Sequence, residues 1–125
     1  MSEMSTPVGQ WTHMSATYDG SQVVVYRNGL ALDSTYASGN VEWIGAPSNF
    51  TIGKFTKNGN SKFFHGKIDE LRLWNIARTP AEIKGSRNLN LNTDEDGLVG
   101  YWQVDEGQSL LIMDSTSNNN PGTIH

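Results

Sequence analysis

The sequence predicts an all-β protein, an antiparallel β-sandwich with one short helix. Its 125 residues suit one compact domain, and only 36% of them are hydrophobic, with a mean hydropathy of -0.49. Such low hydropathy is usual for sheets that keep one face in water. Apolar and polar residues alternate along several short runs, which are separated by glycine-containing turn pairs. These observations predict short strands joined by tight turns.

Composition also excludes several classes of partner. A net charge of -4 and a pI of about 5.2 leave no overall basic character for binding nucleic acid or an anionic membrane. The chain has no cysteine, which excludes disulfides and thiolate metal sites. No apolar run is long enough to span a bilayer, and the first residues lack the hydrophobic core of a signal peptide. We expect no nucleic-acid or membrane partner, and the localisation stays unknown.

The first half of the chain predicts a three-stranded meander. Residues 1–10 are expected to form a lead-in to the domain. Strand patterns follow at residues 11–18, 22–27 and 30–36. Asp19-Gly20 and Asn28-Gly29 separate them, and Asn-Gly is the strongest short hairpin signal because both residues tolerate positive φ.

The middle of the chain contains less regular patterns. Residues 37–48 are rich in turn residues and surround a short apolar piece at 41–44. A strand is expected at 49–55 and a polar loop at 57–61.

Residues 66–75 read as one continuous strand at the centre of the fold. Alternation places Asp69 on the same face as Leu71 and Leu73, which predicts a carboxylate that points into the core, whereas Glu70 would be solvated. A buried carboxylate needs hydrogen bonds or a cation, so Asp69 is a candidate site residue.

A short helix is predicted directly after this strand. Thr79 is the expected N-cap, Pro80 the first helical residue, and Glu82 the partner that completes a capping box. Gly85 is expected to end the helix.

The last part of the chain returns to strands. Residues 98–104 and 110–113 read as strands, separated by the turn at Asp105-Glu106-Gly107. A loop rich in Asp and Asn follows at 114–122.

Five segments, in this order, resemble a bacterial laminin-G-like domain. They are residues 11–20, 25–29, 52–53, 64–75 and 79–83. The resemblance implies the concanavalin A-like jelly-roll fold.

The order of one segment departs from that family. Residues 98–125 resemble strands that usually open such a domain, yet here they come last. One explanation is a single shortened or permuted domain over residues 11–125, in which the strand at 98–104 pairs with that at 68–74. The other is a cut across tandem domains, with exposed edges that pair with a second copy as a homodimer. Because the chain is short and starts with Met, a self-contained domain is the favoured expectation.

The resemblance implies a non-catalytic binding module, with carbohydrate as the expected ligand class. The alternative is a structural or protein-interaction domain that self-associates and binds no sugar. Enzymes of this fold class carry alternating carboxylates along one strand, but Leu71 and Leu73 follow Asp69 at those positions. Without a carboxylate pair, glycosidase chemistry is not expected.

Two sets of residues are candidate sites. Calcium, as a structural ion, would take oxygen ligands from Asp69 and from the polar loop. The loop's candidate ligands are Asp114, Asn118 and Asn120. Sugar contacts are expected from aromatic rings and amides outside the core, namely Tyr36, Asn40, Trp43, Asn58 and Asn60.

Overall fold

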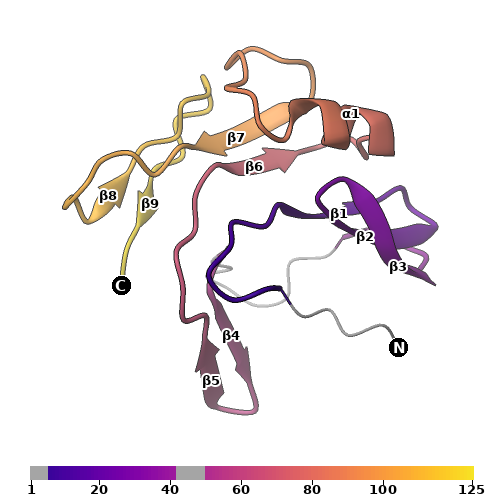
Figure 1. The fold of residues 1–125 in the computed structure, drawn as a ribbon, viewed down its shortest axis with the longest axis horizontal. Helices are drawn as coiled ribbons and strands as arrows, with labels where there is room; N and C mark the ends of the chain where they lie inside the picture. The colour runs from indigo at the N-terminus through magenta and orange to yellow at the C-terminus, as the bar shows by residue number, and fades with distance from the viewer. Residues whose placement is uncertain (1–5, 42–49) are drawn as a thin grey trace.

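A computed structural model describes residues 6–41 and 50–125 of the chain. Its elements are mostly antiparallel strands with one short helix, which confirms the predicted fold class. Figure 1 shows β6 (Leu71–Trp74) and β7 (Leu98–Trp102) together at the top, with α1 (Pro80–Ser86) at one end of them and the three-stranded sheet below. The hairpin of β4 (Lys54–Lys57) and β5 (Asn60–Phe63) extends away from the rest. No helix in this described part of the chain has the length and apolar character needed to cross a membrane.

The predicted meander is present. Its strands are β1 (Met14–Tyr18), β2 (Gln22–Arg27) and β3 (Leu30–Tyr36), and β2 lies in the middle. The turn at Asn28-Gly29 has φ values of 52° and 79°, as the Asn-Gly pair predicts. The expected loop at 37–48 and its apolar piece at 41–44 fall largely outside the described residues.

A second hairpin replaces the polar loop expected at 57–61. β4 (Lys54–Lys57) and β5 (Asn60–Phe63) pair on either side of Asn58-Gly59, whose φ values are 51° and 77°. The strand expected at 49–55 is therefore wrong in position, since β4 begins only at Lys54. The turn pair Asn58-Gly59 is the same signal as Asn28-Gly29, and sequence reasoning overlooked it here.

The central strand is shorter than expected. β6 (Leu71–Trp74) begins after Glu70, whose φ of 55° interrupts the extended backbone. It pairs antiparallel with β7 (Leu98–Trp102), so the predicted pairing of these two segments within one chain is confirmed. β8 (Leu111–Ile112) and β9 (Gly122–Thr123) form a last small hairpin.

The helix α1 (Pro80–Ser86) begins as predicted. Thr79 is its N-cap, and the capping box with Glu82 is complete in both directions. Gly85 does not end the helix, which continues to Ser86 and has Arg87 as its C-cap.

The core is contributed by β2, α1 and β7. Its most buried apolar side chains are Tyr26, Ile83, Leu98 and Tyr101, exposed by 4%, 6%, 7% and 1%. Arg87 donates to the carbonyl of Asn28, and a Cβ at Gly29 would lie 2.8 Å from Lys84 Cα. The helix end is thus held against the turn between β2 and β3.

Candidate functional site

The hairpin of β4 and β5 brings two predicted ligand residues together. Asn58 lies in its turn and Asn60 begins the second strand. All residues of both strands are exposed. The hydrogen bond from Phe64 N to Gly53 O, at 2.8 Å, extends the ladder beyond the strands themselves.

One face of this hairpin combines a ring, an amide and two amines. The register sets Phe55 opposite Lys62 and Lys57 opposite Asn60, and directly opposed residues share a face. We call these four residues the lysine face. Phe55 is 61% exposed, so most of its ring is open to solvent.

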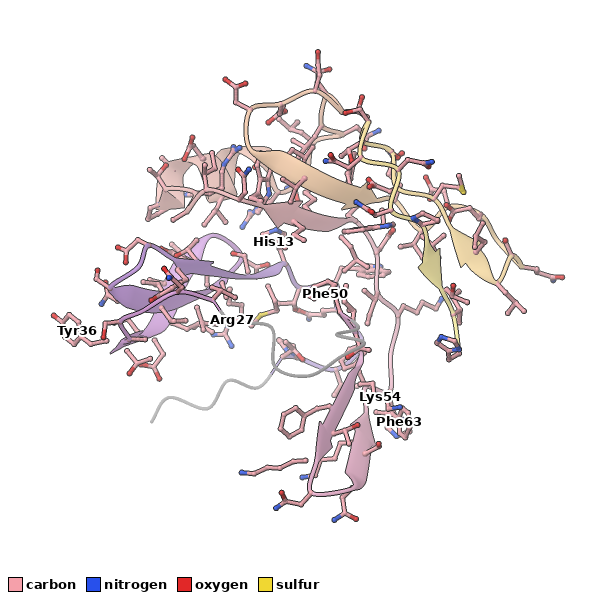
Figure 2. The ribbon with its side chains drawn as sticks, turned by 180° about the vertical axis from the view of Figure 1, so that it is seen from behind. His13, Arg27, Tyr36, Phe50, Lys54 and Phe63 are labelled. Carbon is pink, nitrogen blue, oxygen red and sulfur yellow. The ribbon has the colours of Figure 1, made fainter. Side chains whose placement is uncertain are left out.

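The other face of the hairpin has a different character. The hydroxyls of Thr56 and Ser61 form a hydrogen bond with 2.9 Å between their oxygens. The Lys54 ammonium lies 5.8 Å from the centre of the Phe63 ring. Figure 2 shows Lys54 and Phe63 together on the hairpin, well away from His13. The lysine on this face is therefore associated with a ring of its own hairpin, as a cation and a π face attract.

The lysine face has the functional groups that sugar recognition uses. A flat apolar ring can stack on the C–H face of a sugar, while an amide supplies both a donor and an acceptor for hydroxyls. Lysine adds up to three N–H donors and a positive charge. These groups are exposed on one face of a single hairpin, which provides a surface platform.

The other predicted ligand residues lie elsewhere. Tyr36 is 88% exposed at the end of β3, and Figure 2 places it apart from Lys54 and Phe63. Asn40 is exposed next to Gly39, whose carbonyl accepts a hydrogen bond from the Tyr18 hydroxyl. Trp43 lies outside the described residues. The structure thus does not join Tyr36 and the hairpin into one site.

Asp114 is the best-defined residue of the predicted calcium set. It is 6% exposed, and its Oδ1 accepts hydrogen bonds from the Tyr101 and Thr116 amides, both at 3.0 Å. Its Oδ2 accepts from the Asn120 amide at 3.0 Å, and the Thr116 hydroxyl reaches both oxygens. The carboxylate therefore closes the loop onto β7.

These hydrogen bonds also set the charge state of Asp114. Burial alone raises the pKa of a carboxyl, but the donors from Tyr101, Thr116 and Asn120 together outweigh it and lower the pKa of Asp114. The group is therefore held as an anion by N–H and O–H donors of the chain itself.

The two other predicted ligands in this loop, Asn118 and Asn120, are exposed. The side-chain amide of Asn118 donates to Val99 O at 3.0 Å, and Asn120 O accepts from the Trp102 indole at 2.9 Å. Among residues 6–41 and 50–125, no three His, Cys, Asp or Glu side chains form a group that could hold a metal ion. The donors at Asp114 fit a loop-closing carboxylate, and calcium binding stays a prediction.

The expectation that Asp69 points into the core is wrong. Asp69 is exposed, and its carboxylate accepts from the Glu70 amide at 2.9 Å. The positive φ of Glu70 breaks the strand alternation on which that expectation depended.

Glu70 was expected to be solvated, but its carboxylate instead contacts the side chains of Arg72 and Tyr101. Its Oε2 lies 2.8 Å from Arg72 Nη2 and accepts from the Tyr101 hydroxyl at 2.8 Å. Arg72, with a side chain only 9% exposed, also donates to Ser86 O at 2.9 Å and to Leu89 O. Sequence reasoning missed this network, which ties β6, β7 and the end of α1 together.

Comparison with known proteins places this geometry in context. The family model Laminin_G_3, described as the concanavalin A-like lectin/glucanases superfamily, matches residues 1–84. Pappalysin-1 of Mus musculus is 35% identical over 80 residues, which is 60% of this chain and 5% of that protein.

Two solved structures are similar over most of the chain. One is described as a putative carbohydrate binding protein from Bacteroides ovatus ATCC 8483, with a TM-score of 0.71 and 25% identity over 93% of this chain and 35% of that one. The other is an S-layer domain-containing protein (residues 221–444) from Clostridium thermocellum ATCC 27405. Its TM-score is 0.57, with 27% identity over 67% of this chain and 42% of that one. The chain therefore spans less than half the length of each of these three relatives.

Proposed function

Because the chain belongs to the laminin-G-like family of the concanavalin A-like lectin/glucanase superfamily, we propose that it is a non-catalytic module that binds carbohydrate. One observation carries the ligand class. The structural relative from Bacteroides ovatus, described as a putative carbohydrate binding protein, aligns with 93% of this chain. Fold alone does not fix function, so the ligand must be argued from a surface of this chain.

The lysine face is the surface we propose for the sugar. The exposed Phe55 ring would stack on a sugar, and the Asn60 amide on the paired strand would bind its hydroxyls. Tyr36 with Asn40 is a second, separate aromatic candidate. On the lysine face, the pairing of β4 with β5 fixes the position of the Phe55 ring relative to the Asn60 amide.

The carboxylates of the central segment support a non-catalytic role. Hydrolysis of a glycosidic bond requires an acid and a second carboxylate facing it across the bond. Asp69 lies on the surface and is bonded to its neighbour, while Glu70 is held by Arg72 and Tyr101. These two carboxylates therefore have local structural partners.

The test is glycan binding by two matched variants of one hairpin. Phe55 and Phe63 are both 61% exposed and occupy neighbouring rungs on opposite faces. On a glycan array followed by calorimetry, Phe55→Ala should weaken binding at least about tenfold, whereas Phe63→Ala should change it less than about threefold. Far-UV circular dichroism of both variants checks that the strands remain.

The outcomes separate the possible surfaces. Equal loss from both variants would contradict the assignment to the lysine face, and loss only from Tyr36→Ala would move the site to the end of β3. No binding to any glycan would contradict the proposed function. Repeating the measurement in calcium and in EDTA tests the calcium prediction, which requires binding or thermal stability to fall in EDTA.

A further inference from the structure

The lysines of this acidic chain are concentrated in one segment. Four of the five, Lys54, Lys57, Lys62 and Lys67, lie within residues 54–67, a stretch with no Asp or Glu. With histidine neutral, the segment carries +4, and because the whole chain carries -4, the remainder carries -4 - 4 = -8. We propose that the bound carbohydrate is acidic, a polysaccharide with repeated carboxylate or sulfate groups; this rests on the proposed function.

The register places two of these charges beside the proposed sugar platform. On the lysine face, Phe55 and Asn60 occupy one diagonal of neighbouring rungs, and Lys57 and Lys62 occupy the other. Diagonal neighbours in such a pair lie about 7–8 Å apart, and their Cβ atoms are somewhat closer. A sugar stacked on Phe55 would therefore lie between two ammonium groups.

These two ammonium groups are available to an outside anion. The ion pairs formed within residues 6–41 and 50–125 join Arg72 to Glu70 and Arg78 to Glu82 and Glu95, and involve neither Lys57 nor Lys62. Both lysines lie on strands whose residues are all exposed. A polyanion would therefore gain attraction without first displacing an internal carboxylate.

A second copy of the chain is the less favoured occupant. An isolated two-stranded hairpin is marginal, so the hairpin gains from some partner. In a two-fold dimer, however, the same patch faces itself, which sets lysines against lysines. Lysine is also depleted in protein–protein interfaces. The aromatic residues would suit such an interface, but the charges favour an anionic ligand.

The experiment compares charged and neutral forms of the same polymer. One pair of probes is polygalacturonate and its methyl ester, and the other is dextran sulfate and dextran, so that carboxylate and sulfate are tested separately. In biolayer interferometry at about 20 mM salt, we expect the charged member of at least one pair to bind at least about tenfold more tightly than the neutral one. This preference should shrink at about 200 mM salt, because exposed charges are screened.

A charge-matched pair of variants locates the effect. Lys62→Gln removes one charge from the lysine face, and Lys84→Gln removes one from α1, which Figure 1 shows apart from the hairpin. The first should weaken binding to the acidic polymer at least about fivefold and the second less than about twofold. Melting temperatures of both variants check the fold.

Each result decides between the occupants. Equal binding to neutral and charged polymers would overturn the acidic ligand and leave carbohydrate binding standing, whereas no binding to any polysaccharide would overturn both. Equal effects of Lys62→Gln and Lys84→Gln would overturn the placement. Tighter binding to duplex DNA than to either acidic polymer would overturn the acidic polysaccharide as the ligand in favour of nucleic acid. If light scattering shows that the wild type is a dimer and that Phe55→Ala is a monomer, the acidic polysaccharide would be overturned as the occupant in favour of self-association.

Discussion

The hydroxyl of Tyr101 donates a hydrogen bond of 2.8 Å to Glu70 Oε2, the oxygen that also lies 2.8 Å from Arg72 Nη2. Tyr101 is 1% exposed on β7, whereas Glu70 directly precedes β6. The Arg72 guanidinium also lies 5.4 Å from the centre of the Tyr101 ring. A single buried phenol thus joins a carboxylate and a cation of the paired strand.

Tyr101→Phe tests this link. The variant keeps the ring and loses one hydrogen bond, so the free energy of unfolding should fall by about 1 kcal/mol at neutral pH. Burial, followed by the hydrogen bond to Glu70, raises the pKa of Tyr101. Because the protonated phenol is favoured in the folded state, its contribution is present below pH about 10 and is lost as pH rises through the folded pKa.

Urea denaturation of the wild type and Tyr101→Phe between pH 8 and 11 measures this difference. The difference between the two stabilities should shrink as pH rises above about 10. A constant difference across that range would contradict a role for the phenol proton.

Asp114→Asn and Asp69→Asn form a second matched comparison. Asp114 is buried and accepts several hydrogen bonds, so removing its charge should lower the free energy of unfolding by about 1–3 kcal/mol. Asp69 is exposed, and its variant should stay within about 0.5 kcal/mol of the wild type. Equal costs would show that the loop does not depend on the Asp114 carboxylate.

The same carboxylate predicts a loss of stability in acid. Because the pKa of Asp114 is lowered in the folded state, its contribution is present above the unfolded value of about 3.9 and is lost as pH falls through the folded pKa. Thermal unfolding measured from pH 6 to pH 2 should show the difference between the wild type and Asp114→Asn shrinking as pH falls below about 3.9.

Gly29→Ala and Gly59→Ala distinguish turn strain from packing. The two glycines have nearly equal φ values, 79° and 77°, so both variants should lose about 1–2 kcal/mol from left-handed strain. A Cβ at Gly29 would lie 2.8 Å from Lys84 Cα, whereas nothing lies within 4 Å of one at Gly59. In chemical denaturation, Gly29→Ala should therefore lose at least about 1 kcal/mol more of the free energy of unfolding than Gly59→Ala.

His13 predicts a further pH effect, near neutrality. Its Nδ1 is buried without a hydrogen-bond partner in the described structure, and desolvation, followed by the charges of Arg72 and Arg87, lowers its pKa. Because the folded state disfavours the imidazolium, stability should fall as pH decreases below the unfolded value of about 6.5, and this decrease should end below the folded pKa.

His13→Gln should remove that part of the pH dependence. His65, which is exposed, supplies the control variant His65→Gln. Melting temperatures recorded from pH 8 to pH 5 give the comparison. A pH profile that is unchanged in His13→Gln would contradict the assignment.

Local chemistry was sufficient to predict much of the fold. Asn28-Gly29 predicted the tight turn between β2 and β3, since both residues accept positive φ. Thr79, Pro80 and Glu82 predicted the start of α1, because the cap is completed within four residues. The resemblance of the motifs to a laminin-G-like domain was confirmed by the family match.

The sequence by itself determined the class of fold, the turns and the helix start, because each depends on residues adjacent in the chain. Only the tertiary structure decided which carboxylate is held inside: the positive φ at Glu70 breaks the alternation, leaves Asp69 in solvent and brings Glu70 to Arg72 and Tyr101. It likewise decided that Phe55, Lys57, Asn60 and Lys62 share one exposed face, since strand register across a hairpin sets which side chains meet. Alternation along one strand gives neither the partner nor the register.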